Sequence, residues 1–154
     1  MISPAPLTGN RGDGPDIFII AGESSGDELG AGLMDAIRKS ESNARFRGVG
    51  GPSMTARGFT SLFPMQDIAV MGFLPVMRNL PRLLTRIRTA ALAAIENPPD
   101  ILVIIDSPDF THRVARRVRT SCPKVPIVNY VSPTVWAWRP GRAKKMRRYV
   151  DHLL

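Results

Sequence analysis

The chain has 154 residues, a length that suits one domain, and its 44% hydrophobic content is ordinary for a globular protein. The single cysteine, Cys122, excludes an internal disulfide framework and favours a reducing compartment. No apolar run approaches the roughly 20 residues of a membrane-spanning helix. The formal net charge of +8 points to an anionic partner, such as nucleic acid, an anionic membrane surface or a phosphorylated substrate. The basic clusters at 113–119 and 139–148 could equally be solvated helix faces.

The first 15 residues are rich in proline, glycine and small polar side chains, and they lack the apolar core of a signal peptide. We expect residues 1–15 to form a disordered leader. One domain would then occupy residues 16–154.

Short apolar runs alternate with helical patterns in the first half of the chain. The run Asp16–Ala21 predicts a strand that is buried on both faces, and the apolar spacing after it predicts a helix over 26–39. The next predicted elements are a strand over 45–50, a short helix over 53–57 and a short strand over 59–63.

The second half continues the same alternation. A helix is predicted over 80–95, with Pro81 near its start and arginines on its polar face, and residues 100–106 form the clearest central strand. The remaining predicted elements are a helix over 110–121, a strand over 125–131, a basic helix over 139–149 and a strand over 151–154. This order predicts an α/β fold, a Rossmann-like parallel sheet with helices on both faces.

Three segments lie at the carboxyl ends of predicted strands, where parallel sheets bind ligands. The first contains Glu23, Ser24, Ser25 and Asp27 among glycines that allow a tight turn and a close backbone approach. Its acidic residues would repel a phosphate, so we expect this loop to meet hydroxyl groups. The alternative is an ordinary helix start with Ser24 or Ser25 as the N-cap.

The second segment contains Asp106, at the end of a buried strand. A carboxylate there is costly unless it lies in a cleft or is paired. In a partly desolvated cleft its pKa would rise, which suits a general base. Asp109 is more simply explained as the N-cap of the helix that follows.

The third segment carries Ser132, Trp136, Trp138 and Arg139. Aromatic faces beside an arginine suit a sugar ring, a lipid headgroup or a base, but the tryptophans could equally cap the core at the sheet edge. The apolar residues 71–77 are either a tip that enters a membrane interface or part of the core. No group of His and Cys has the spacing of metal ligands.

Taken together, these stretches resemble the lipid-A-disaccharide synthase family. The motifs that carry the resemblance occur in the family's order and are Ala21-Gly-Glu-Ser-Ser-Gly-Asp27, Leu29-Gly-Ala-Gly-Leu33, Gly48-Val-Gly-Gly-Pro52, Met71-Gly-Phe73, Ile105-Asp-Ser-Pro-Asp-Phe110 and Tyr130-Val-Ser-Pro-Thr-Val-Trp-Ala-Trp-Arg139. They run from about residue 17 to residue 154, so the resemblance covers nearly everything but the leader.

The resemblance implies an inverting glycosyltransferase of the two-Rossmann-domain (GT-B) type, without a metal or cofactor. It would join UDP-2,3-diacylglucosamine to 2,3-diacylglucosamine 1-phosphate, giving lipid A disaccharide 1-phosphate and UDP. Asp106 matches the general base of the family. Glu23, Ser24, Ser25 and Asp27 match its first loop, and Ser132, Trp136 and Arg139 match its tryptophan loop. The family works in the cytoplasm, peripherally on the inner face of the cytoplasmic membrane.

Family members are about twice this length, and their C-terminal half supplies most of the UDP site. We therefore expect this chain to be the acceptor-side domain, inactive by itself and either marginally stable or a homo-oligomer. A degenerate gene product remains an open alternative. Another is a non-catalytic basic α/β module that binds anionic lipid or nucleic acid. The acidic first loop and the lack of a recognised motif argue against nucleic acid.

Overall fold

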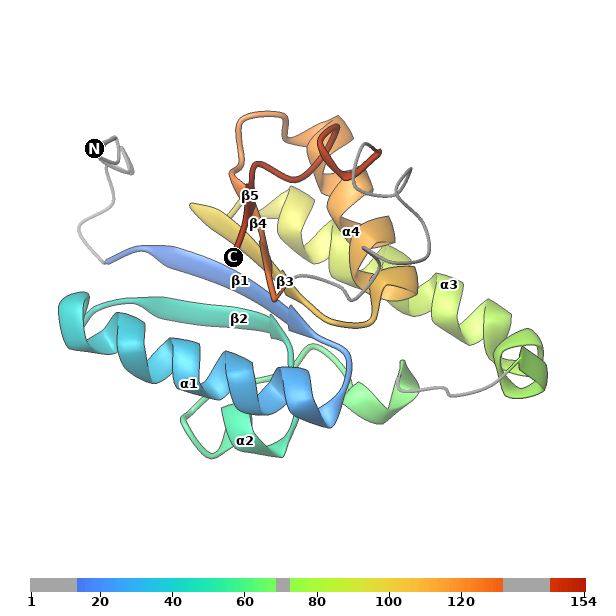
Figure 1. Ribbon diagram of the computed structural model, residues 1–154, viewed down its shortest axis with the longest axis horizontal. Helices are drawn as coiled ribbons and strands as arrows, with labels where there is room; N and C mark the ends of the chain where they lie inside the picture. Colours follow the sequence, from blue (N-terminus) through green and yellow to red (C-terminus); the bar gives the residue numbers. More distant parts are fainter. Residues whose placement is uncertain (1–13, 69–72, 132–144) are drawn as a thin grey trace.

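Five parallel strands form one sheet in the order β2-β1-β3-β4-β5 (Figure 1). A computed structural model describes residues 14–68, 73–131 and 145–154 of the chain, and only the backbone of residues 73–79. The strands are β1 (Asp16–Ala21), β2 (Arg45–Val49), β3 (Ile101–Ile105), β4 (Ile127–Tyr130) and β5 (His152–Leu153). The predicted parallel sheet is confirmed.

Helices cover both faces of the sheet, as the alternating pattern predicted. Helix α1 (Ser24–Ser40) and the short helix α2 (Pro52–Thr55) lie on one face. Helix α3 (Phe73–Glu96) and helix α4 (Pro108–Ser121) lie side by side on the other face (Figure 1). A 3₁₀ turn, η1 (Met65–Asp67), precedes α3.

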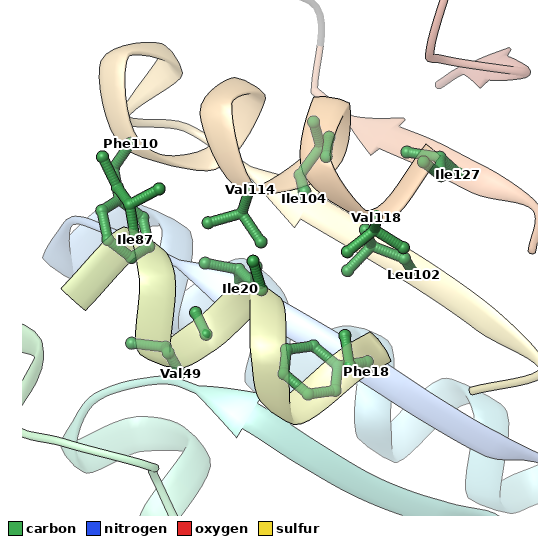
Figure 2. Close-up of a cluster of buried hydrophobic side chains, with 14 of the residues drawn as sticks. Phe18, Ile20, Val49, Ile87, Leu102, Ile104, Phe110, Val114, Val118 and Ile127 are labelled. Carbon is green, nitrogen blue, oxygen red and sulfur yellow. The ribbon is translucent and has the colours of Figure 1, made fainter. Parts of the chain in front are cut away.

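Each face of the sheet has its own core because successive side chains of a strand point to opposite faces. Phe18 and Ile20 of β1 pack with Leu102 and Ile104 of β3 under α3 and α4 (Figure 2). Ile19 and the other alternate residues of β1 and β3 pack under α1 and α2. The central strands are therefore buried on both sides, which explains their continuous apolar sequences.

Two predictions in the first half of the chain are wrong in detail. Helix α1 begins at Ser24, with Glu23 as an N-cap residue that makes no side-chain cap bond, so neither serine is the cap. Residues 59–63 form only a single bridge, between Ser61 and Gly48, and no strand. Phe59 and Phe63 are buried there, so core anchoring alone accounts for their apolar character.

The second half also departs from the predicted boundaries. Helix α3 begins at Phe73, so Pro81 lies inside the helix and not near its start. Asp109 is not the N-cap of α4, because Ser107 occupies that position and Pro108 is the first helical residue, where proline is favoured. The strand predicted at 151–154 is confirmed as β5, parallel to β4. Most of the helix predicted over 139–149 lies outside the described residues.

Candidate functional site

The point between β1 and β3 is where the connections of the sheet diverge. These two strands are neighbours, yet the chain leaves β1 towards β2 on one side and leaves β3 towards β4 on the other. Open α/β sheets bind ligands at such a point, outside the carboxyl ends of the strands. Gly22 follows β1 directly and Asp106 follows β3 directly, so the fold brings the first two predicted segments together at this position.

The backbone turns sharply at Asp106. Both Asp106 and Ser107 have left-handed backbone angles, with φ of 52° and 38°. Each such residue costs about 1–3 kcal/mol, and conformations of this kind cluster at functional sites. The turn ends β3 and begins α4 within two residues, which holds the Asp106 side chain at the carboxyl edge of the sheet.

One carboxylate oxygen of Asp106 is bonded to the β1–α1 turn. The backbone N–H of Gly22 donates to Asp106 Oδ1 at 2.8 Å. Oδ2 is buried and has no hydrogen-bond partner within the described residues. The residue as a whole is half-buried, so it lies at the rim of the sheet and not deep in the core.

The pKa of Asp106 is raised from its ordinary value of 3.8 to about 6. Burial is the largest cause because it disfavours the charged carboxylate, and the negative charge of Glu23 acts in the same direction. The hydrogen bond from the backbone N–H of Gly22 lowers the pKa and offsets part of the rise. The carboxyl group therefore titrates near neutral pH, which is the range that suits a general base.

Two glycines make room for Asp106. A Cβ atom at Gly26 would lie 1.7 Å from Asp106 Oδ2, and one at Gly22 would lie 2.3 Å from the Ser107 side chain. From the sequence we expected these glycines to allow a tight turn and a close backbone approach. The structure shows what approaches so closely, namely the carboxylate and the turn that follow β3.

Three of the predicted site residues lie at the start of α1, next to Asp106. Glu23, Ser24 and Ser25 are all exposed there. The hydroxyl of Ser107 donates to Glu23 Oε1 at 3.3 Å, linking the two loops directly. An exposed acid and two exposed hydroxyls at this edge of the sheet are able to bind hydroxyl groups of a ligand.

Asp27 behaves differently from its neighbours. It is buried, and its carboxylate accepts hydrogen bonds from the backbone N–H groups of Gly51, Ser53 and Met54 at 2.8, 2.7 and 3.1 Å. These donors belong to the start of α2, so Asp27 fixes that helix against α1. The structure gives Asp27 a structural task and gives no support to our expectation that it contacts a substrate.

A family model described as lipid-A-disaccharide synthetase matches residues 17–154. The chain belongs to this family. Among its relatives, a lipid-A-disaccharide synthase of Rhodopseudomonas palustris (strain BisB18) is 63% identical over 139 residues, which cover 90% of this chain and 35% of the relative. The corresponding synthase of Nitrobacter hamburgensis is 62% identical over the same length and the same shares.

A third relative of the lipid-A-disaccharide synthase family aligns with nearly the whole chain. The synthase of Rhodopseudomonas palustris (strain ATCC BAA-98 / CGA009) is 55% identical over 154 residues, covering 99% of this chain and 39% of the relative. The chain thus spans between about a third and two fifths of the length of these synthases, which are therefore longer than the twofold length that we expected. It corresponds to their N-terminal part.

The tryptophan loop expected from the lipid-A-disaccharide synthase motifs lies outside the described residues, so the predictions for Ser132, Trp136 and Arg139 stay predictions. The residue before this loop is described. Val131 follows β4 with φ of 79°, which is unusual for a β-branched residue. Because β4 runs parallel to β3, Val131 lies at the same edge of the sheet as Asp106.

The arginine stripe of α3 has a partner that sequence analysis missed. Arg82 and Arg86 both pair with the buried carboxylate of Asp67 in η1, and Arg86 Nε lies 2.8 Å from Oδ2. These two arginines therefore anchor η1 to α3. No helix among the described residues is both long and apolar enough to cross a membrane. The side chains of residues 71–77 lie outside the described part.

Proposed function

We propose that the chain is the acceptor-side domain of a lipid-A-disaccharide synthase, over residues 16–154. The complete enzyme would join UDP-2,3-diacylglucosamine to 2,3-diacylglucosamine 1-phosphate and release UDP. Membership of the family supports this function, and so do the names of the relatives. The observation that carries it is Asp106, a half-buried carboxylate whose pKa is raised to about 6 at the carboxyl edge of the sheet, where the connections of β1 and β3 diverge.

Asp106 is proposed as the general base. It would take the proton from the 6-hydroxyl of the acceptor as that oxygen attacks the anomeric carbon and UDP leaves with the bonding electrons. A carboxyl with a pKa of about 6 is mostly ionised at neutral pH and is a stronger base than an ordinary carboxylate. A single displacement assisted by one base inverts the anomeric configuration, because no covalent glycosyl-enzyme forms.

Other residues of the same edge would bind the sugars. Glu23, Ser24 and Ser25 would hold acceptor hydroxyls in the crevice, since all three are exposed beside Asp106. Ser132, Trp136 and Arg139 would border the same cleft from the loop after β4. Sequence from the remainder of a full-length synthase would supply the UDP site, so the chain by itself would not turn over. Because its substrates are acylated, the complete enzyme would work peripherally on the inner face of the cytoplasmic membrane.

A fusion of this chain to the remaining C-terminal sequence of the Rhodopseudomonas palustris CGA009 synthase tests the proposal. The alignment runs through the whole chain, which fixes the junction after Leu154. The fusion should form the disaccharide, and the chain alone should not. Asp106→Asn in the fusion should lower kcat by about 10²–10⁴-fold, the usual contribution of a general base. The coupling constant of the anomeric proton in the product reports the configuration.

Asp35→Asn is the matched control, because Asp35 is a partly exposed carboxylate on α1 that pairs with Arg57 and lies in no crevice. It should leave kcat unchanged. Near-normal turnover by the Asp106→Asn fusion would reject Asp106 as the base. Disaccharide formation by the chain alone would reject the proposal that the remaining sequence is needed for the UDP site.

A further inference from the structure

A groove of about 820 Å³ runs along α3 and α4, and Asp106 is not among the residues that line it. Its apolar residues recur along α3 at Leu84, Ala91, Leu92 and Ile95. Leu84 and Leu92 are each 41% exposed, whereas Ala91 is buried and Ile95 packs against the core, so the exposed apolar stripe consists of the two leucines. From Leu84 to Leu92 the stripe covers about 12 Å, or just over two helical turns.

Four arginines line the same groove, and Arg88 lies between Leu84 and Leu92 on α3. Arg88 comes from α3, and Arg113, Arg116 and Arg117 come from α4. No acidic residue lines the groove, and none of the four arginines forms an ion pair with a described carboxylate. Arg82 and Arg86 show the contrast, since both pair with the carboxylate of Asp67.

We propose that this groove, lined by Leu84, Arg88, Leu92, Arg113 and Arg117, binds an acidic amphipathic helix of a partner protein. Two helices packed side by side leave a channel that a third helix fills, with its apolar face on the floor and its polar flanks against the rims. Glutamate and aspartate on both flanks of that helix complement the arginines, whose planar guanidinium groups bind carboxylates in pairs of hydrogen bonds.

The shape of the surface favours a helix over a bilayer. An amphipathic surface enters a membrane interface through apolar side chains that protrude from a convex face. Here the exposed leucines lie in a groove between two helices, together with arginines of both helices. A planar bilayer reaches such a groove poorly, whereas a rod of about 10 Å diameter fits along it.

Binding of a defined peptide tests the proposal. The probe is a fluorescein-labelled peptide of about 14 residues with a leucine stripe flanked by two rows of glutamate, which is long enough for the groove. Fluorescence anisotropy with the full 154-residue chain gives the Kd. Arg113→Glu/Arg117→Glu should raise the Kd at least about tenfold, because two favourable charge pairs become repulsive. Leu92→Gln should weaken binding as well.

Arg147→Glu/Arg148→Glu is the matched control, because both residues are exposed, lie outside the groove and change the net charge equally. It should change the Kd by less than about twofold, as expected of distant screened charges. A peptide of the same composition in scrambled order should bind at least about tenfold more weakly, since its leucines no longer share a face.

Three results would overturn the proposal. Equal binding of the ordered and scrambled peptides would show that net charge alone accounts for the binding. A second result concerns lipid. If Arg113→Glu/Arg117→Glu abolishes binding to phosphatidylglycerol vesicles and no peptide binding depends on the groove, the groove binds lipid. Self-association that depends on Leu92 in sedimentation velocity would assign the groove to a second copy of this chain.

Discussion

The raised pKa of Asp106 makes the stability of the fold depend on pH. The folded pKa of about 6 lies above the ordinary 3.8, so folding favours the protonated carboxyl. Its stabilising contribution is fully present below pH 3.8 and is lost as the pH rises through about 6. After a discount for solvent screening of this half-buried group, the loss is about 1–2 kcal/mol.

Asp106→Asn removes this titration. The variant should be about 1–2 kcal/mol more stable than the wild type near pH 7.5, and the difference should fall towards zero near pH 4. Urea unfolding followed by circular dichroism at the two pH values measures it. Asp35→Asn, on the outer side of α1, should show no such pH-dependent gain. A wild type as stable as Asp106→Asn at neutral pH would mean that the carboxylate is not desolvated.

Gly26 is required by the side chain that lies against it. A Cβ atom there would meet Asp106 Oδ2 at 1.7 Å, so Gly26→Ala must displace either the carboxylate or the start of α1. We expect a loss of about 1–3 kcal/mol in the free energy of unfolding, as for other overpacked sites. We also expect the pH dependence due to Asp106 to change, because its surroundings move.

Gly32→Ala is the control for Gly26→Ala within the same helix. Nothing lies within 4 Å of a Cβ atom at Gly32, and the residue is exposed. Alanine there should stabilise the helix by about 0.5–1 kcal/mol, since glycine is a poor helix former. Equal effects of the two substitutions in urea unfolding would show that packing against Asp106 does not constrain Gly26.

At the scale of elements, one buried carboxylate joins α1 to α2. Asp27→Ala would leave the backbone N–H groups of Gly51, Ser53 and Met54 without their acceptor. Buried donors that lose their partner cost about 1–3 kcal/mol each, and the partial entry of water should keep the total near 3 kcal/mol. Hydrogen exchange followed by NMR should show faster exchange at these three amides. Unchanged exchange would mean that Asp27 does not hold α2.

Sequence patterns predicted the strands well and the helix boundaries less well. Strands β1 and β3 are buried on both faces, so their sequences are unbroken apolar runs that few other structures explain. The early start of α3 was missed because Pro81 is typical of a first turn, whereas here packing tolerates it inside the helix. Residues 59–63 look like a strand because Phe59 and Phe63 are core anchors.

The sequence predicted the site residues only where the direction of the strands determines their position. Asp106 was found because it ends a central strand, and parallel strands place their carboxyl ends at one edge. Sequence could not separate Asp27 from Glu23, because both lie in one acidic segment and only tertiary packing shows which carboxylate meets α2. The sequence also could not show that Gly26 packs against the side chain of Asp106, since the two residues are distant in the chain.

At the scale of the whole molecule, the two edges of the sheet differ. Residues 59–62 cover part of the β2 edge, where Leu62 N–H donates to Gly48 O. At the other edge no described segment pairs with the outer side of β5, and Leu153 is 43% exposed. Open, uncharged edge strands pair with other chains. The two-residue length of β5 keeps this pairing weak, so we expect reversible association of the chain at high concentration.

Leu153→Lys should abolish this association, because a charged side chain on an edge strand opposes pairing with a second strand. Sedimentation velocity across the micromolar range should show a concentration-dependent rise in the sedimentation coefficient for the wild type and none for the variant. Leu29→Lys changes an equally exposed leucine (40%) on α1, away from both edges, and should associate like the wild type. Equal suppression by the two variants would assign the association to general hydrophobic contact or to net charge, and the β5 edge would then have no special part in it.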